Sequence, residues 1–305
     1  MINFAMILQP VLGIVLAPML LGVINRVKAN FAGRRGQPVL QPYYDLRRLL
    51  HKGVVYSSTT SWIFKAMPVI CLSAVLLTVF IVPIGCDKTL LGFNGDLILV
   101  AYLLGLMRFF LVIGALDTGS SFEGMGASRE VQFSALAEPA LFIALAAMAR
   151  QTSSISFSGI FSAITPAVWT SNCATLLLAA AAMIIVLLAE NARIPVDDPN
   201  THLELTMIHE VMALDNSGPD LAFIMYGAAL KLWIFAAILV GIIVPCGAMS
   251  LWLSMPIAVA AIFVVAILTG IVESCMARLR LIYVPHLLFA AIALAILSLV
   301  FALRN

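Results

Sequence analysis

The chain has 305 residues, of which 63% are apolar and only 10% are charged, against roughly 25% charged residues in an average soluble domain. This composition excludes a soluble fold. It also excludes a disulfide-stabilised secreted scaffold, because the five cysteines lie in or beside apolar runs and form no CxxC pair. A net charge of +2 gives no large field for phosphate groups, so we expect no nucleic-acid partner.

Eight apolar runs are each long enough to cross a hydrocarbon core of ~30 Å. They predict an all-α, polytopic membrane protein whose single transmembrane domain covers residues 1–305. We place the eight spans at about residues 4–24, 66–85, 97–116, 131–149, 173–189, 222–245, 251–272 and 284–303.

The basic residues predict the orientation of these spans. An even number of spans puts both termini on one side of the membrane. Twelve of the 17 Lys and Arg residues fall in the loops after spans one, three, five and seven, and cytoplasmic loops carry the excess of such residues. We therefore expect a multi-pass protein of the cell (inner) membrane with both termini in the periplasm. Three of its cytoplasmic loops stand out, a basic one over 25–65, a small-residue one over 117–130 and an acidic one over 190–220.

Three ionisable residues fall deep inside the spans, at similar distances from the cytoplasmic side: Arg108, Glu138 and Lys231. A charge in the middle of a span costs at least ~2.5–3.5 kcal/mol unless it is paired or hydrated. The shared depth predicts one polar layer in which Glu138 neutralises a cation. A proton or ion path and a structural ion pair both explain such a layer. Glu273, at the cytoplasmic end of span seven, either joins the path or is interfacial.

The loop over 190–220 holds seven carboxylates against one Arg. Asp198 before a proline, or Thr201 with a Glu three residues later, would start a helix over about 199–214. Glu204 falls on the apolar face of that helix, where partial desolvation suits a carboxylate to proton relay. The alternative for Glu204 is a role as the capping-box partner of Thr201.

The sequence predicts no catalytic residue, no metal site and no redox cofactor in this chain. His202 and His209 share the polar stripe of the expected helix, but their spacing is not a zinc pattern, so we expect them to contact a partner or to form local hydrogen bonds. There is no Cys cluster for an iron–sulfur centre, no pair of intramembrane histidines for haem and no Gly-rich nucleotide fingerprint.

The first loop contains an amphipathic pattern. Leu46, Leu49 and Leu50 lie at positions i, i+3 and i+4 beside basic residues, which predicts a short surface helix. Such a helix serves either as a headgroup anchor or as a docking surface for a partner.

Several segments, each weak alone, form a specific combination over most of the chain. They are Arg34-Arg35-Gly36 with Leu40-Gln41 and Tyr44-Asp45, Arg108-Phe109-Phe110, Leu116-Asp117-Thr118-Gly119-Ser120, Gly126-Ala127-Ser128-Arg129-Glu130, Glu138-Pro139, Glu190-Asn191-Ala192-Arg193-Ile194-Pro195-Val196-Asp197-Asp198 and Met276-Ala277-Arg278-Leu279-Arg280. Together they resemble the subunit-1 family of respiratory complex I. They resemble more closely its relatives in membrane-bound group 4 nickel–iron hydrogenases, of the formate hydrogenlyase and hydrogenase-4 type.

The resemblance implies a proton-conducting subunit of an oxidoreductase complex that anchors the peripheral electron-transfer arm. The nickel–iron and iron–sulfur centres would belong to partners, namely the hydrogenase large subunit and the small iron–sulfur subunit, and antiporter-like membrane subunits would be neighbours in the lipid bilayer. With the intramembrane charges, the expected proton path comprises Arg108, Glu138, Glu190, Arg193, Asp197, Asp198, Glu204, Glu210, Lys231 and Glu273. The expected docking residues are Arg34, Arg35, Asp45, Asp117, Arg129 and Glu130.

The stretch from Thr206 to Gly218 looks longer than in the quinone-reducing subunit of complex I, which favours the hydrogenase branch. Three alternatives stay open. They are a quinone-binding membrane subunit of a complex I-like NADH:quinone oxidoreductase, a stand-alone ion transporter, and a structural anchor with inert intramembrane charges.

Overall fold

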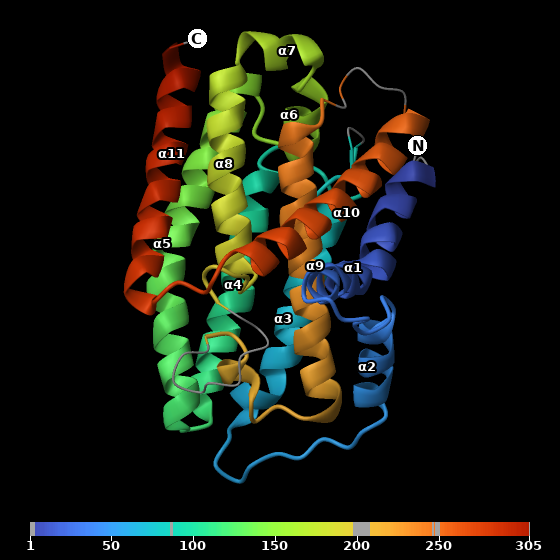
Figure 1. The fold of residues 1–305 in the computed structure, drawn as a ribbon, viewed down its shortest axis with the longest axis vertical. Coiled ribbons are helices and arrows are strands. Elements are labelled where there is room, and N and C mark those ends of the chain that lie inside the picture. The colour runs from blue at the N-terminus through green and yellow to red at the C-terminus, as the bar shows by residue number, and fades with distance from the viewer. Residues whose placement is uncertain (1–3, 86–87, 198–207, 246, 248–250, 305) are drawn as a thin grey trace.

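The computed structural model describes residues 4–85, 88–197, 208–245, 247 and 251–304, and within them the chain forms helices and no strand. Eight described helices are long and apolar enough to span a membrane, which confirms the all-α, eight-span prediction. They form one bundle (Figure 1) and are α1 (Phe4–Phe31), α3 (Trp62–Ile81), α4 (Asp96–Asp117), α5 (Ser121–Thr152), α8 (Cys173–Glu190), α9 (Gly218–Ile243), α10 (Leu251–Cys275) and α11 (Val284–Arg304).

Helix α9 forms the centre of the bundle, with contacts to α1, α2, α3, α8 and α10. Its residues from Ala229 to Ile242 are almost all buried, and Trp233 is among the largest side chains with essentially no exposed surface. A helix that is apolar on all sides is expected in this position. Lys231 belongs to this stretch and therefore lies inside the protein rather than against lipid.

Helix α1 is bound to its neighbours at the point where a proline interrupts its hydrogen bonding. Pro18 has no backbone N–H, so the carbonyl of Ile14 lacks its usual helical partner. The Tyr226 hydroxyl of α9 donates to that carbonyl at 2.9 Å. The Tyr43 hydroxyl of α2 (Gln41–Leu50) donates to the carbonyl of Val15. These two bonds connect α1, α2 and α9.

The predicted surface helix in the first loop is confirmed as α2. It has no buried residue, and it packs on α1 and α9. Lys52 follows the helix and is exposed. The end of the loop is attached by hydrogen bonds to α9 and to its N-cap. The Tyr56 hydroxyl donates to Asp220 at 2.8 Å, and the backbone N–H of Val55 donates to the hydroxyl of Ser217 at 3.1 Å.

The predicted small-residue loop over 117–130 is wrong in extent. Only residues 118–120 separate α4 from α5, which starts at Ser121 instead of near 131 and has 32 residues. A helix of that length measures about 48 Å, so its first turns continue beyond a hydrocarbon core of ~30 Å. Gly119 stays in the short connection with a φ of 70°. Gly124 and Gly126 lie inside the helix, where Gly126 allows a neighbouring segment to approach closely.

The predicted helix over 199–214 is wrong in the part that the structure describes. Residues 208–210 are turns and Val211–Ala213 is a single 3-10 turn, η1. The N–H of Ile208 binds a carboxylate oxygen of Asp197 at 3.1 Å, and the Ile208 side chain is buried. These tertiary contacts replace a regular helix there. Asp198, Thr201, His202 and Glu204 lie outside the described residues.

The loop between α5 and α8 holds two short helices, α6 (Phe157–Ala163) and α7 (Pro166–Ser171). Both termini and α7 lie toward the same end of the bundle in Figure 1, as an even number of spans requires. The side of the membrane that this end faces stays a prediction.

Candidate functional site, a buried ion cluster beside a cavity

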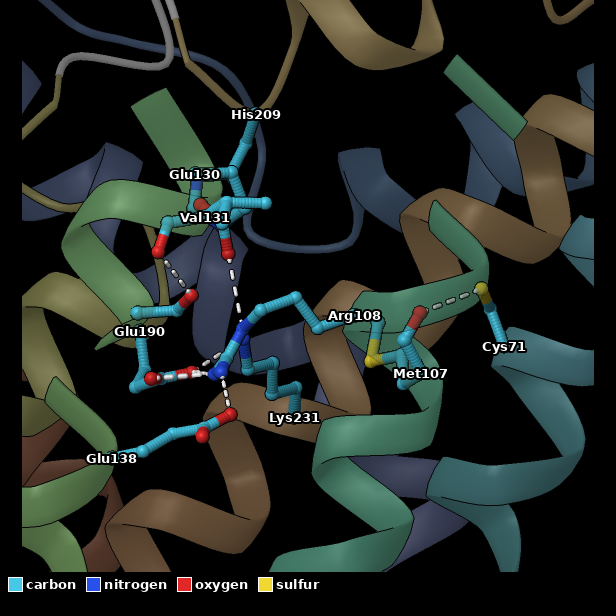
Figure 2. Close-up of polar contacts among 10 residues, drawn as sticks. Cys71, Met107, Arg108, Glu130, Val131, Glu138, Glu190, His209 and Lys231 are labelled. Atoms are coloured by element: carbon cyan, nitrogen blue, oxygen red, sulfur yellow. Dashed lines mark hydrogen bonds and ion pairs between the residues drawn. The ribbon is translucent and has the colours of Figure 1, made fainter. Parts of the chain in front are cut away.

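Arg108 of α4 lies among three carboxylates inside the bundle (Figure 2). Its Nη2 atom is 2.6 and 2.5 Å from the two carboxylate oxygens of Glu190, the last residue of α8. Its Nη1 atom binds Glu138 of α5, and its Nε atom is 3.2 Å from Oε1 of Glu130, two turns earlier on α5. One guanidinium group therefore connects three helices.

Lys231 of α9 adds a second cation, with Nζ 2.9 Å from Oε2 of Glu190. Glu190 thus contacts both cations and is almost completely buried. We call Arg108, Glu130, Glu138, Glu190 and Lys231 the buried cluster. Such charges are tolerated in an apolar interior because each has a partner of opposite sign. The predicted polar layer is confirmed in its geometry, since Glu138 pairs with Arg108.

A cavity of about 470 Å³ lies against the buried cluster. Its polar wall includes Arg108, Glu130, Glu190 and Lys231. Its apolar wall comes from α1, α4 and α9 and from the segments that hold Ala192 and Leu214. Glu138 does not line the cavity, and 43% of its side chain is exposed elsewhere. Arg108 therefore lies between Glu130 and Glu190, which line the cavity, and Glu138, which does not.

A second group of charges holds the segment after α8 in place. The Glu273 side chain of α10 is fully buried, with Oε2 2.8 Å from Nζ of Lys28 and Oε1 3.3 Å from Nη1 of Arg193. Arg193 also lines the cavity. Asp197 pairs with Arg278 at 2.9 Å and accepts the N–H of Ile208. Glu273 is therefore a buried ion-pair partner rather than an interfacial residue.

The comparisons with known proteins identify the family. The NADH dehydrogenase family model matches residues 2–303. The chain belongs to the NADH dehydrogenase, complex I subunit 1-type, family.

Relatives within this family are similar over much of their length. Formate hydrogenlyase subunit 4 of Escherichia coli (strain K12) is 31% identical over 301 residues, which are 96% of each chain. Hydrogenase-4 component C of the same organism is 31% identical over 239 residues, which cover 78% of this chain and 74% of that one. A chain of the membrane-bound sulfane sulfur reductase (MBS), an archaeal respiratory membrane complex, shares the fold, with a TM-score of 0.83, 22% identity and 98% of each chain covered.

The described residues of this family member contain no group of three or more His, Cys, Asp or Glu side chains arranged to hold a metal ion. The polar groups on the cavity wall are instead paired ions, with the amides of Asn191 and Asn216 and the imidazole of His209 among them. This set can bind water and pass protons.

The residues predicted for docking fall into two groups. Arg34 and Arg35 are exposed in the turns after α1, and Asp45 on α2 accepts a hydrogen bond from Gln41 at 2.9 Å. These three stand near the surface, where a partner can reach them. Arg129 is half-buried on α5.

Asp117 and Glu130 already bind groups within the chain. Asp117 accepts hydrogen bonds from the backbone N–H and the hydroxyl of Ser61 at 2.7 and 2.9 Å, which fixes the end of α4 to the N-cap of α3. Glu130 is buried and contacts Arg108. The sequence grouped Glu130 with the surface because it placed the start of α5 ten residues too late.

Sequence reasoning also missed the position of His209. Its Nε2 atom is 3.3 Å from Oε2 of Glu130, and its ring lines the cavity. The polar stripe that His209 shared with His202 was the available signal, but nothing in the sequence paired it with Glu130. Glu210 beside it is exposed and also lines the cavity.

Proposed function

We propose that this chain is the membrane-anchoring, proton-conducting subunit of a hydrogenase complex of the formate hydrogenlyase type. It docks the peripheral electron-transfer arm and couples electron flow to ion translocation. The observation that carries the proposal is the buried cluster on the cavity wall, because ionisable groups inside membrane spans are costly and mark ion pathways. The similarity to formate hydrogenlyase subunit 4 and hydrogenase-4 component C supports the hydrogenase type over the quinone-reducing alternative.

The proposed path begins at the cavity and crosses the cluster. Glu130 accepts protons on the cavity side, beside the ionised Glu190, and Glu138 releases them on the other side of Arg108. The guanidinium stays protonated at any ordinary pH. It therefore stabilises whichever of the neighbouring carboxylates is ionised at a given moment. Lys231 holds Glu190 from the opposite side.

Glu138 supports the assignment of neighbouring membrane subunits. A carboxylate with 43% of its side chain exposed, in the middle of a span, needs cover from water or from another protein. An antiporter-like subunit packed against this part of α5 would supply that cover and take up the proton. Asp198 and Glu204, outside the described residues, would extend the path, together with Arg193, Asp197, Glu210 and Glu273.

The same proposal places the remaining partners. The hydrogenase large subunit and the small iron–sulfur subunit, with their nickel–iron and iron–sulfur centres, would bind on the cytoplasmic side at Arg34, Arg35, Asp45 and the α5 start. The chain itself would lie in the cell inner membrane, with both termini in the periplasm.

Purification of the complex through an affinity tag on this chain tests the identity of the complex. We expect stoichiometric nickel and iron with no tightly bound flavin. Flavin and quinone without nickel would instead establish the complex I-like alternative, and recovery of the chain without any redox subunit would favour a stand-alone transporter.

Lys231→Met tests conduction. The change removes the cation that holds Glu190, so we expect proton translocation in membrane vesicles to fall while the complex still assembles and evolves hydrogen. Lys52→Met, at an exposed lysine, is the matched control. Normal translocation by Lys231→Met would mean that the cluster is a structural anchor.

A further inference from the structure

The charges of the buried cluster do not balance. Glu130, Glu138 and Glu190 supply three negative charges, and Arg108 and Lys231 supply two positive ones. An excess charge in an apolar interior is expensive, and a titratable group usually takes up a proton instead. One proton in or beside the cluster balances these five charges.

The contacts indicate where that proton resides. Glu190 contacts both cations at 2.5–2.9 Å, which favours its ionised form. Glu138 binds Arg108 and is partly exposed. Glu130 has the longest contact with Arg108, 3.2 Å, and its other carboxylate oxygen is 3.3 Å from Nε2 of His209. A proton on either Glu130 or His209 makes the cluster and its neighbour neutral.

His209 lies where such a proton would enter. Its ring belongs to the cavity wall and contacts Glu130 on the cluster side, and 22% of its side chain is accessible. Its charged surroundings are Glu130 of α5, Arg108 of α4 behind it, and the other charged residues of the cavity wall, namely Glu190 of α8, Lys231 of α9, Arg193 and Glu210. Histidine is the side chain whose ordinary titration range suits such an exchange near neutral pH.

We propose that His209 and Glu130 share one exchangeable proton, and that His209 loads this proton from the cavity into the buried cluster. Both ring nitrogens are buried and lack a hydrogen-bond partner among the described residues, so the ring, neutral with its hydrogen on Nδ1, turns toward the cavity and takes up a proton at Nε2. It turns back and passes this proton from Nε2 to Oε2 of Glu130, which leaves the ring neutral as it began. The neutral Glu130 releases part of its hold on Arg108, which stays balanced by Glu138 and Glu190. This inference rests on the proposed function.

Chemical rescue in membrane vesicles that contain the complete complex tests the inference. We expect His209→Ala to lower proton translocation on the order of 10²-fold, the usual size of a lost acid–base group, and added imidazole to restore it. Pyrazole has the same shape but is too weak a base to take up the proton, so it restores nothing. The matched control is His286→Ala, because His286 is exposed at the start of α11 and bonds only locally to the carbonyl of Ile282.

The second variant, His209→Gln, keeps a polar side chain near Glu130 without a group that can load a proton. We expect His209→Gln to lose translocation as His209→Ala does. If the alanine variant fails to assemble, His209→Gln still tests the inference. Equal rescue by pyrazole, or translocation by His209→Gln equal to that of His286→Ala, would overturn the inference. Lys231→Met measured in parallel separates the two proposals. If it loses translocation while both His209 variants keep it, only the role of His209 fails. If it also translocates normally, the proposed function fails.

Discussion

Glu190 is the residue on which the site depends most. It is the only side chain among the described residues with an ion pair to both Arg108 and Lys231, and it ends α8 at the point where the polar segment begins. The carboxylate therefore joins α4, α8 and α9 through charges that the apolar surroundings do not screen. The sequence indicated a role for Glu190 only through the family resemblance. A carboxylate at the end of a span is common, because a charge costs little there.

Glu190→Gln should destabilise the protein by about 3–5 kcal/mol, the usual cost of breaking a buried ion pair, and abolish translocation. A lower thermal midpoint of the purified complex would report the first effect. The double variant Glu190→Gln with Lys231→Met removes both opposite charges, so it should recover much of the stability without recovering translocation. Recovery of both properties would contradict a conducting role.

Tyr56 offers a pH-dependent contact outside the spans. The hydrogen bond that its hydroxyl donates to Asp220, followed by burial, raises the pKa of Tyr56 above its ordinary value. A group with a raised pKa stabilises the fold fully below its unfolded pKa of about 10, and the contribution is lost as the pH rises through the folded pKa.

Tyr56→Phe should therefore weaken the attachment of the first loop to α9 at neutral pH by about 0.5 kcal/mol, a low value because the site is partly exposed. Limited proteolysis of the loop at pH 7 and at a pH beyond the raised pKa of Tyr56, well above ~10, would measure it. The difference between variant and native chain should vanish at the higher pH. A difference that persists there would exclude the hydrogen bond as its source.

At the scale of elements, the packing of α5 against residues 208–216 shapes the cavity. Glu123 in the first turn of α5 accepts the N–H of Asp215 at 3.0 Å and the hydroxyl of Thr118. A Cβ atom at Gly126 would lie 2.7 Å from Cγ1 of Val211 and 2.9 Å from the carbonyl oxygen of Ile208. The segment that carries His209 can lie close to Glu130 only because position 126 has no side chain.

Gly126→Ala should therefore destabilise the protein by about 1–3 kcal/mol, the range for overpacked sites, and displace the segment that carries His209. Gly124→Ala is the control, because a Cβ atom there meets nothing within 4 Å. That change should stabilise the helix by roughly 0.5–1 kcal/mol. Thermal unfolding should show a lower midpoint for Gly126→Ala and a higher midpoint for Gly124→Ala. Equal shifts of the midpoint would mean that Gly126 has no special packing role.

These elements also show what the sequence could predict. Long apolar runs determine spans by simple energetics, so all eight were found, and the three leucines of the first loop were enough to find α2. The start of α5 was missed because glycine and serine favour loops locally, and their close packing against residues 208–212 is a tertiary contact. The same contact replaces the expected helix at 208–214. The pairing of Glu130 with His209 depends on this contact, so the sequence alone did not indicate it.

At the scale of the whole molecule, the buried ion pairs of the described residues lie toward one end of the bundle, which we call the polar end. Glu190 ends α8, and Lys28 and Glu273 lie in the last turns of α1 and α10, so these charges lie away from the helix ends beside α7 and the termini. On the proposed path, protons would enter from the polar end, since among the described residues α9 is apolar beyond Lys231. The direction of coupling therefore depends on which side of the membrane the polar end faces.

Two exposed cysteines can decide this orientation. Cys173 starts α8 at the end that holds the termini, and Cys275 finishes α10 at the other end. The excess of basic residues near the polar end predicts that it faces the cytoplasm. In right-side-out vesicles, a membrane-impermeant maleimide should therefore label a chain that keeps only Cys173 and spare a chain that keeps only Cys275, and inverted vesicles should give the reverse. The opposite pattern would place the cavity in the periplasm, and the peripheral arm could not then dock beside it on the cytoplasmic side.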